Sequence, residues 1–109
     1  MVRALISLSV SMLFIPVCAA ADRQMESILL AQQLGDVLAS EGFCGLSYDQ
    51  VATQGFIEKK VRADDLQFNS TLTLMTMGAK VQHDDLSPSG KTAHCMQTMR
   101  VAKSYGFIR

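Results

Sequence analysis

Apolar side chains recur at intervals of three and four residues along most of this chain, and that interval is the period of one face of an α-helix. The first such stretch runs from Asp22 to Glu41, and its apolar positions are Met25, Ile28, Leu29, Leu30, Leu34, Val37 and Leu38. An acidic residue at its start suits the positive end of the helix dipole. The pattern predicts a helix over 22–41 that ends at Gly42 and Gly45.

A capping signal predicts the second helix. Ser47 and Gln50 have the spacing of a capping box, with serine as the N-cap and glutamine three residues later. The helix is expected to carry apolar residues as far as Val61. Gly55 in its interior weakens this helix by about 1 kcal/mol relative to alanine.

The last helix has signals at both ends. Ser87 followed by Pro88 is typical of a helix start, and Gly106 is typical of a helix end. We expect a helix from about Pro88 to Tyr105, after which Phe107 folds back onto the core. The face expected to be buried consists of Cys95, Met99 and Ala102.

The stretch Leu66–Val81 allows two interpretations. Asp64-Asp65 offers an N-cap, and a helical face is formed by Phe68, Leu72, Met75 and Ala79. Residues 71–74 alternate polar and apolar side chains, which is typical of a strand. We expect a helix, because the acidic cap and the length of the stretch favour it. The predicted fold class is therefore all-α: one small four-helix domain over 22–109.

The first 21 residues have the order of a secretory signal peptide. Arg3 precedes an uncharged run, Ala4–Val17, and small residues follow it. Cleavage is expected after Ala20 or Ala21, which predicts a periplasmic or secreted protein with no membrane span after cleavage. An uncleaved anchor is the alternative, since the stretch without charge extends from Ala4 to Ala21 and is at the lower edge of the length that spans a bilayer.

Removing the leader also removes Cys18 and leaves Cys44 and Cys95. An oxidising compartment favours a disulfide between them, since neither lies in a C-x-x-C motif. The bridge is expected to stabilise the fold by about 4 kcal/mol. A redox-active thiol or a metal ligand is the competing interpretation.

The charge of the chain is balanced, with ten basic and ten acidic residues. No net charge therefore directs the chain to nucleic acid or to an anionic membrane. Acidic residues outnumber basic ones between Asp22 and Glu58, whereas all charged residues from Lys91 to Arg109 are basic. Complementary helix faces are the simpler explanation, and a basic surface for an acidic partner is the other.

No motif predicts catalysis or a cofactor. Ser89-Gly90-Lys91-Thr92 resembles the end of a phosphate-binding loop, but no strand is expected before it, as that loop requires. We therefore predict a protein that is not an enzyme. The residues His94, Met96 and Met99 suggest an alternative, a periplasmic copper-binding carrier with imidazole and thioether ligands. Helix geometry argues against it, because residues two apart point to different sides.

The leader, the helical chain of about ninety residues and the pair Cys44 and Cys95 resemble the small acid-stress periplasmic chaperones of the HdeA type. The chain also resembles uncharacterised small exported proteins of alphaproteobacteria. The first resemblance implies a binding or chaperone-like protein of the cell envelope, acting through apolar surface on another envelope protein or as a dimer. Protonation of carboxylates and histidines in acid is expected to expose this apolar surface, through dissociation of the dimer or partial unfolding.

Overall fold

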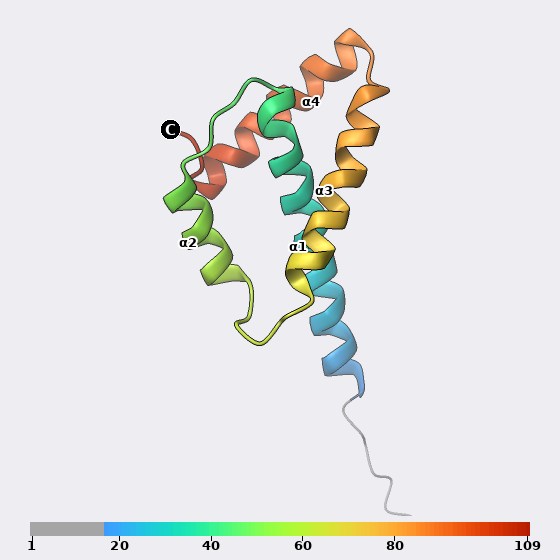
Figure 1. Ribbon diagram of the computed structural model, residues 1–109, viewed down its shortest axis with the longest axis vertical. Coiled ribbons are helices and arrows are strands. Elements are labelled where there is room, and N and C mark those ends of the chain that lie inside the picture. The colour runs from blue at the N-terminus through green and yellow to red at the C-terminus, as the bar shows by residue number, and fades with distance from the viewer. Residues whose placement is uncertain (1–16) are drawn as a thin grey trace, which may run out of the picture.

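The computed structural model describes residues 17–109, and these fold into four helices without a strand (Figure 1). The helices are α1 (Val17–Phe43), α2 (Gln50–Lys60), α3 (Phe68–Asp84) and α4 (Pro88–Tyr105). The predicted all-α fold of four helices is thus confirmed for this part of the chain. Residues 1–16 of the predicted signal peptide lie outside the described residues, and its last five, 17–21, begin α1. None of the helices within 17–109 combines the length and the apolar character that crossing a bilayer requires.

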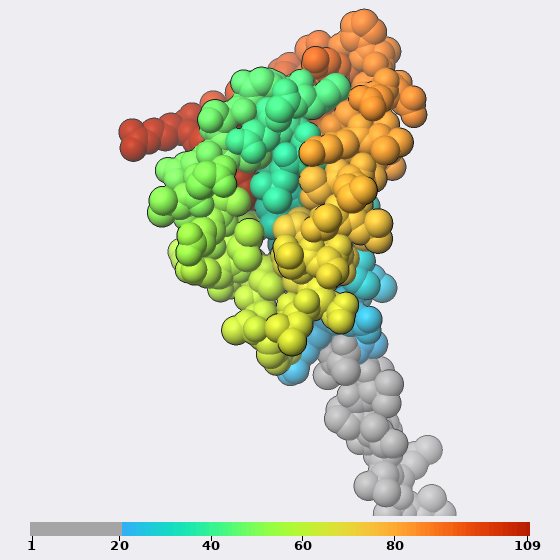
Figure 2. Space-filling view, viewed as in Figure 1, coloured from blue at the N-terminus to red at the C-terminus, as the bar shows by residue number. Residues whose placement is uncertain are grey.

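α1 and α3 form the main helix pair. They lie side by side and run in the same direction (Figure 1), and α3 covers one side of α1 (Figure 2). The two helices approach each other closely at Gly35, where a Cβ atom would lie 2.9 Å from Cβ of Met75. The buried residues that these two helices give to the core are Ala31, Leu34, Val37, Phe68 and Leu72. The two backbones come together because residue 35 has no side chain.

α4 crosses the C-terminal end of α1, and a disulfide fixes the crossing (Figure 1). The bridge joins Cys44, which directly follows α1, to Cys95 in α4, and the two residues are 51 positions apart in sequence. The predicted disulfide is confirmed, and it links the first helix to the last.

α2 packs against α4 rather than against α1, and the end of the chain returns over both. Phe107 is fully buried, and its ring lies 5.4 to 5.5 Å from those of Tyr48, Phe56 and Tyr105. The backbone N–H of Asp49 donates to the carbonyl of Phe107 at 2.8 Å. The prediction that Phe107 folds back onto the core is therefore confirmed.

The ends of the first two helices differ from the prediction. α1 is longer at both ends than the predicted 22–41. The N-cap of α2 is Asp49 and not Ser47, because the Asp49 carboxylate accepts the N–H groups of Val51 and Ala52 at 2.9 and 3.1 Å. Two residues could cap this helix, and the aspartate closer to it does so.

The start of α3 was also predicted too early. The helix begins at Phe68 rather than near Leu66, because the two aspartates that were expected to cap it have other partners. Asp64 pairs with Arg62 at 2.8 Å, and Asp65 accepts a hydrogen bond from Ser27 of α1. Residues 71–74 are helical, so the alternative strand does not form.

α4 has the predicted bounds, with Ser87 as N-cap and Gly106 at a φ of 82° after its last residue. Its buried face, however, is turned from the predicted one. Met99 is 39% exposed, whereas Thr98 is 4% exposed and lies on the inner side with Ala102. The disulfide and the packing of α4 across α1 set this rotation, and the apolar pattern of α4 is too weak to show it.

Candidate functional site

The two histidines of the sequence meet in space, although they belong to different helices. His83 lies in the last turn of α3 and His94 in α4, and their ring centroids are 4.5 Å apart. Phe43 at the end of α1 stacks on His83 with the ring centroids 4.7 Å apart, and it forms a T-shaped pair with His94 at 6.2 Å. The C-terminal end of α1 is therefore the surface on which both rings rest.

Polar side chains of α1 complete this arrangement. Asp36, Ser40 and Cys44 follow one another at intervals of four residues and so lie along one face of the helix end. Because Cys44 is bonded to Cys95, the neighbouring residue His94 is held close to Ser40. We call Asp36, Ser40, His83 and His94 the histidine cluster.

The hydrogen bonds of Ser40 define the tautomer of His94. The Ser40 hydroxyl lies 2.7 Å from the Asp36 carbonyl and 2.7 Å from Nε2 of His94. A carbonyl only accepts, so the single hydroxyl hydrogen of Ser40 donates to Asp36, and His94 Nε2 donates to Ser40. A neutral His94 then keeps its free lone pair on Nδ1.

His83 is held more loosely. Its side chain is only 5% exposed, and its Nε2 lies 3.3 Å from Oδ1 of Asp36, which is long for a hydrogen bond. Its Nδ1 is buried and has no hydrogen-bond partner within the described part of the chain. A buried polar atom without a partner is uncommon, which singles out His83 as a candidate functional residue.

The cluster contains serine, histidine and aspartate, but its geometry is unlike that of a hydrolase site. Ser40 is 0% exposed, and its hydroxyl hydrogen is engaged by a backbone carbonyl. A serine nucleophile instead donates its hydrogen to a histidine base and faces the substrate. The contacts of Ser40 position His94 and Asp36 rather than activate the hydroxyl.

The predicted copper ligands are spread around α4. Successive residues of a helix are turned by about 100°, so Met96 and Met99 project at wide angles from His94. Met96 is 63% and Met99 is 39% exposed, whereas His94 is half-buried. The site formed by His94, Met96 and Met99 stays a prediction, and the side chains beside His94 are His83 and Ser40.

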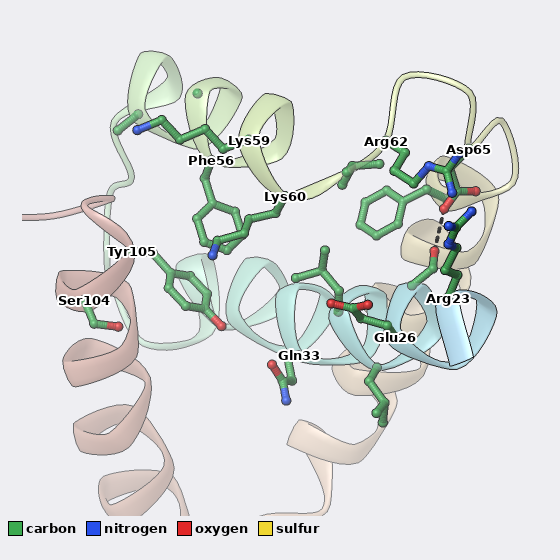
Figure 3. Close-up of a pocket in the computed structure, with 17 residues that line it drawn as sticks. Arg23, Glu26, Gln33, Phe56, Lys59, Lys60, Arg62, Asp65, Ser104 and Tyr105 are labelled. Atoms are coloured by element: carbon green, nitrogen blue, oxygen red, sulfur yellow. Dashed lines mark hydrogen bonds between the residues drawn. The ribbon is translucent and has the colours of Figure 1, made fainter. Parts of the chain in front are cut away.

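A second feature is a groove of about 1050 Å³ between α1 and α2 that reaches the end of α4 (Figure 3). Phe56 and Tyr105 stack at 4.3 Å at one end, and Arg62 and Asp65 lie at the other. Its apolar lining consists of Leu29, Leu30, Ala52, Phe56, Val61, Phe68 and Tyr105. The groove exists because α2 leans on α4 and leaves this side of α1 uncovered.

Basic side chains surround the groove. Arg23, Lys59, Lys60 and Arg62 line it, against two carboxylates, those of Glu26 and Asp65. Among the described residues the ion-pair contacts are those of Arg62 with Asp64 and of His83 with Asp36. Within the described part of the chain, Arg23, Lys59 and Lys60 therefore have no carboxylate in ion-pair contact.

Sequence reasoning identified His94 but missed its partners. A usable signal was present: the predicted disulfide places the residue before Cys95 next to the residues one and two turns before Cys44, which are Ser40 and Asp36. No comparable signal leads to His83, because its position depends on how α3 packs on α1. The groove could not be predicted either, since it results from the way α2 packs on α4 rather than on α1.

Comparisons of this chain with protein-family models, with curated proteins and with solved structures found no match.

Proposed function

We propose that this chain is an exported protein of the cell envelope that binds other polypeptides in the manner of a chaperone and carries out no catalysis. The binding site is the groove between α1 and α2, and its ligand is a polypeptide segment with both apolar and acidic side chains. The observation that carries the proposal is an apolar groove beside cations that have no ion-pair contact among the described residues.

The apolar part of the groove supplies binding energy. Leu29 is 48% exposed, and Phe56, which also lines the groove, is partly exposed. Covering such side chains removes apolar surface from water, which stabilises a complex by about 25 cal/mol for each Å². Exposed apolar surface with a polar edge is typical of protein interaction sites.

The basic edge of the groove supplies selectivity. Four cations against two carboxylates give the lining a net positive charge, although the whole chain is formally neutral. A positive surface attracts acidic segments and repels basic ones, and salt weakens both effects.

Polar groups along the groove favour a polypeptide over an acyl chain. Ser27, Gln33 and Ser104 line it together with the apolar side chains. The hydroxyls of Ser27 and Ser104 already donate to Asp65 and to the Val101 carbonyl. A peptide backbone offers a donor and an acceptor to the Gln33 amide, which an acyl chain would cover without a hydrogen bond at a cost in free energy.

Export is supported by the disulfide between Cys44 and Cys95, since such bonds form in oxidising compartments. The intact mass of the protein purified from the envelope tests this part of the proposal. We expect a chain cleaved after Ala20 or Ala21 and lighter by the two thiol hydrogens. A protein that keeps residues 1–21 would contradict cleavage.

Binding is tested by fluorescence anisotropy with two labelled peptides of equal length, one alternating leucine with glutamate and the other leucine with lysine. We expect the acidic peptide to bind. Lys60→Glu is expected to lower its affinity about tenfold, because an attractive charge is replaced by a repulsive one. Leu29→Gln is expected to weaken it about fivefold. The matched controls are Lys80→Glu and Leu74→Gln, since both residues are exposed on α3 and neither lines the groove.

Equal affinity for both peptides, or equal effects of groove and control variants, would contradict the proposal. Decanoate is the third ligand. If it binds the groove and no peptide does, the site is one for acyl chains and the proposed polypeptide ligand is wrong. Suppression of client aggregation, lost in Leu29→Gln and kept in Leu74→Gln, is the functional counterpart that we expect.

A further inference from the structure

We propose that Asp36, His83 and His94 form a binding site for a divalent transition-metal ion of borderline hardness, namely Zn²⁺ or Cu²⁺. The site lies near the C-terminal end of α1, whereas Arg23 of the groove lies near the N-terminal end of that helix. None of the three residues lines the groove, so the two sites are separate. It also differs from the predicted copper site, because His94 is combined with an imidazole and a carboxylate rather than with thioethers.

The donor set determines the class of ion. Two imidazoles and one carboxylate suit Zn²⁺ and Cu²⁺, whereas Cu⁺ prefers thiolate or thioether sulfur and Ca²⁺ prefers oxygen alone. Three protein ligands leave a fourth position for water. The half-exposed side chain of Asp36 gives this position access to solvent.

The distances fit a site that closes slightly on the ion. One ligand atom from each of the three residues lies within 4.8 Å of the other two. Bonds of about 2.0 to 2.1 Å in a tetrahedral arrangement place ligand atoms about 3.3 Å apart. His83 Nε2 and Asp36 Oδ1 are already 3.3 Å apart, so the remaining movement is a small rotation of side chains.

The surroundings of His83 give a second argument for a bound cation. Nδ1 is buried and has no hydrogen-bond partner in the part of the chain that is described, and His83 as a whole is only 5% exposed. An imidazole has one lone pair when neutral, and whichever nitrogen carries it, one contact of His83 is deficient. When Nε2 carries it, the lone pair faces the Asp36 carboxylate at 3.3 Å, and a metal ion bound between Nε2 and Oδ1 replaces this repulsion by attraction to both atoms.

The surroundings of His94 have the form of an outer coordination shell. Metal-bound histidines usually donate their second N–H to an oxygen, which fixes the ring and makes it more basic. His94 Nε2 donates to Ser40, and Ser40 donates to the Asp36 carbonyl, both at 2.7 Å. The disulfide beside His94 holds α4 in place, so this ring is positioned before an ion arrives.

Binding of an ion is expected to raise the melting temperature, because each of the three ligands comes from a different helix. Asp36 belongs to α1, His83 to α3 and His94 to α4. An ion that binds the folded state and not separate helices raises the melting temperature as its concentration rises. We expect such a rise with Zn²⁺ and none with Mg²⁺.

The test is competition of the untagged, disulfide-bonded protein with a chromogenic chelator for Zn²⁺ and for Cu²⁺. We expect one ion per chain. Asp36→Asn, His83→Gln and His94→Gln are each expected to weaken binding by more than about tenfold. Asp84→Asn and Met96→Ala serve as controls, since both residues are exposed and outside the cluster, and both are expected to bind as the parent does.

His83 is buried, and its variant is checked for folding by circular dichroism. Asp36→Asn keeps the shape of a half-exposed side chain, so it tests the site even if His83→Gln unfolds. Electron paramagnetic resonance of the Cu²⁺ form supplies a second readout: two imidazole nitrogens in the parent and one in His94→Gln. Unchanged affinity in Asp36→Asn and His94→Gln overturns the proposal. Loss in Met96→Ala with retention in Asp36→Asn overturns it in favour of the thioether site.

Discussion

Gly35 of α1 lies directly against Met75 of α3, and a Cβ atom at position 35 would be 2.9 Å from Cβ of Met75 and 3.0 Å from the backbone nitrogen of Thr76. Neither neighbour is the flexible end of a long side chain, so neither can move aside alone. We expect Gly35→Ala to force the two helices apart and to lower the free energy of unfolding by about 1 to 3 kcal/mol.

Gly78→Ala is the matched control for this prediction. Gly78 also lies within a helix, but among the described residues nothing lies within 4 Å of where its Cβ would be. Alanine is the better helix former, so this variant is expected to gain up to about 1 kcal/mol. Urea unfolding followed by circular dichroism measures both variants, and a stabilising Gly35→Ala would contradict the close approach.

The N-cap of α2 gives a second prediction. The Asp49 carboxylate accepts two backbone N–H groups, so Asp49→Ala is expected to cost about 1 kcal/mol. Ser47→Ala is expected to be nearly neutral, because Ser47 is exposed and is not the cap. Equal costs in thermal unfolding of the two variants would show that the capping box predicted from the sequence operates after all.

The disulfide gives a third prediction. Replacing Cys44 and Cys95 together by alanine removes a bridge between residues 51 positions apart and is expected to cost about 4 kcal/mol. The same change frees His94 from Ser40, so the Zn²⁺ affinity is expected to fall as well. Chemical unfolding and the chelator competition measure the two effects, and an unchanged unfolding midpoint would contradict the first.

Tyr48 gives a prediction of alkaline sensitivity. Burial, and then the charges of Glu41 and Asp36, raise the pKa of Tyr48 from 10.0 to about 12. The fold therefore favours the neutral phenol, whose hydroxyl donates to the Val37 carbonyl at 2.7 Å. This contribution to stability is fully present below pH 10 and is lost as the pH rises from 10 to 12.

Tyr48→Phe removes both the hydrogen bond and the titrating group. We expect a loss of about 1 kcal/mol at neutral pH and a shallower fall in stability between pH 10 and 12. Urea unfolding at a series of pH values compares it with the parent protein. If the free energy of unfolding falls equally steeply in both proteins above pH 10, the prediction of a buried phenol at position 48 is wrong.

The elements with strong local signals were predictable. Ser87-Pro88 and Gly106 fixed both ends of α4, and the two cysteines that remain after the leader gave the disulfide. The start of α3 was not predictable, because Asp65 bonds to Ser27, a residue far away in the sequence. Hydrophobic periodicity predicts which residues share one face of a helix. It does not predict that an expected capping residue will instead bind a side chain of another helix.

The candidate sites depend even more on tertiary packing. His94 was recognisable from its neighbours, whereas Asp36 and His83 gain their role only when α1 and α3 lie together. Likewise, the helix pattern around Met99 favoured a buried side chain, and the rotation of α4 about its axis exposes it. Both outcomes depend on angles between helices, which no local pattern encodes.

The common direction of α1 and α3 sets the order in which the molecule can fold. Two helices that run the same way cannot be joined by a tight turn, so the chain must travel back through α2 before α3 begins. The pair Gly35 and Met75 therefore closes a loop of about forty residues, and this non-local contact slows folding relative to a bundle of antiparallel neighbours. During synthesis or export in the N-to-C direction, the apolar face of α1 stays uncovered until α3 has emerged.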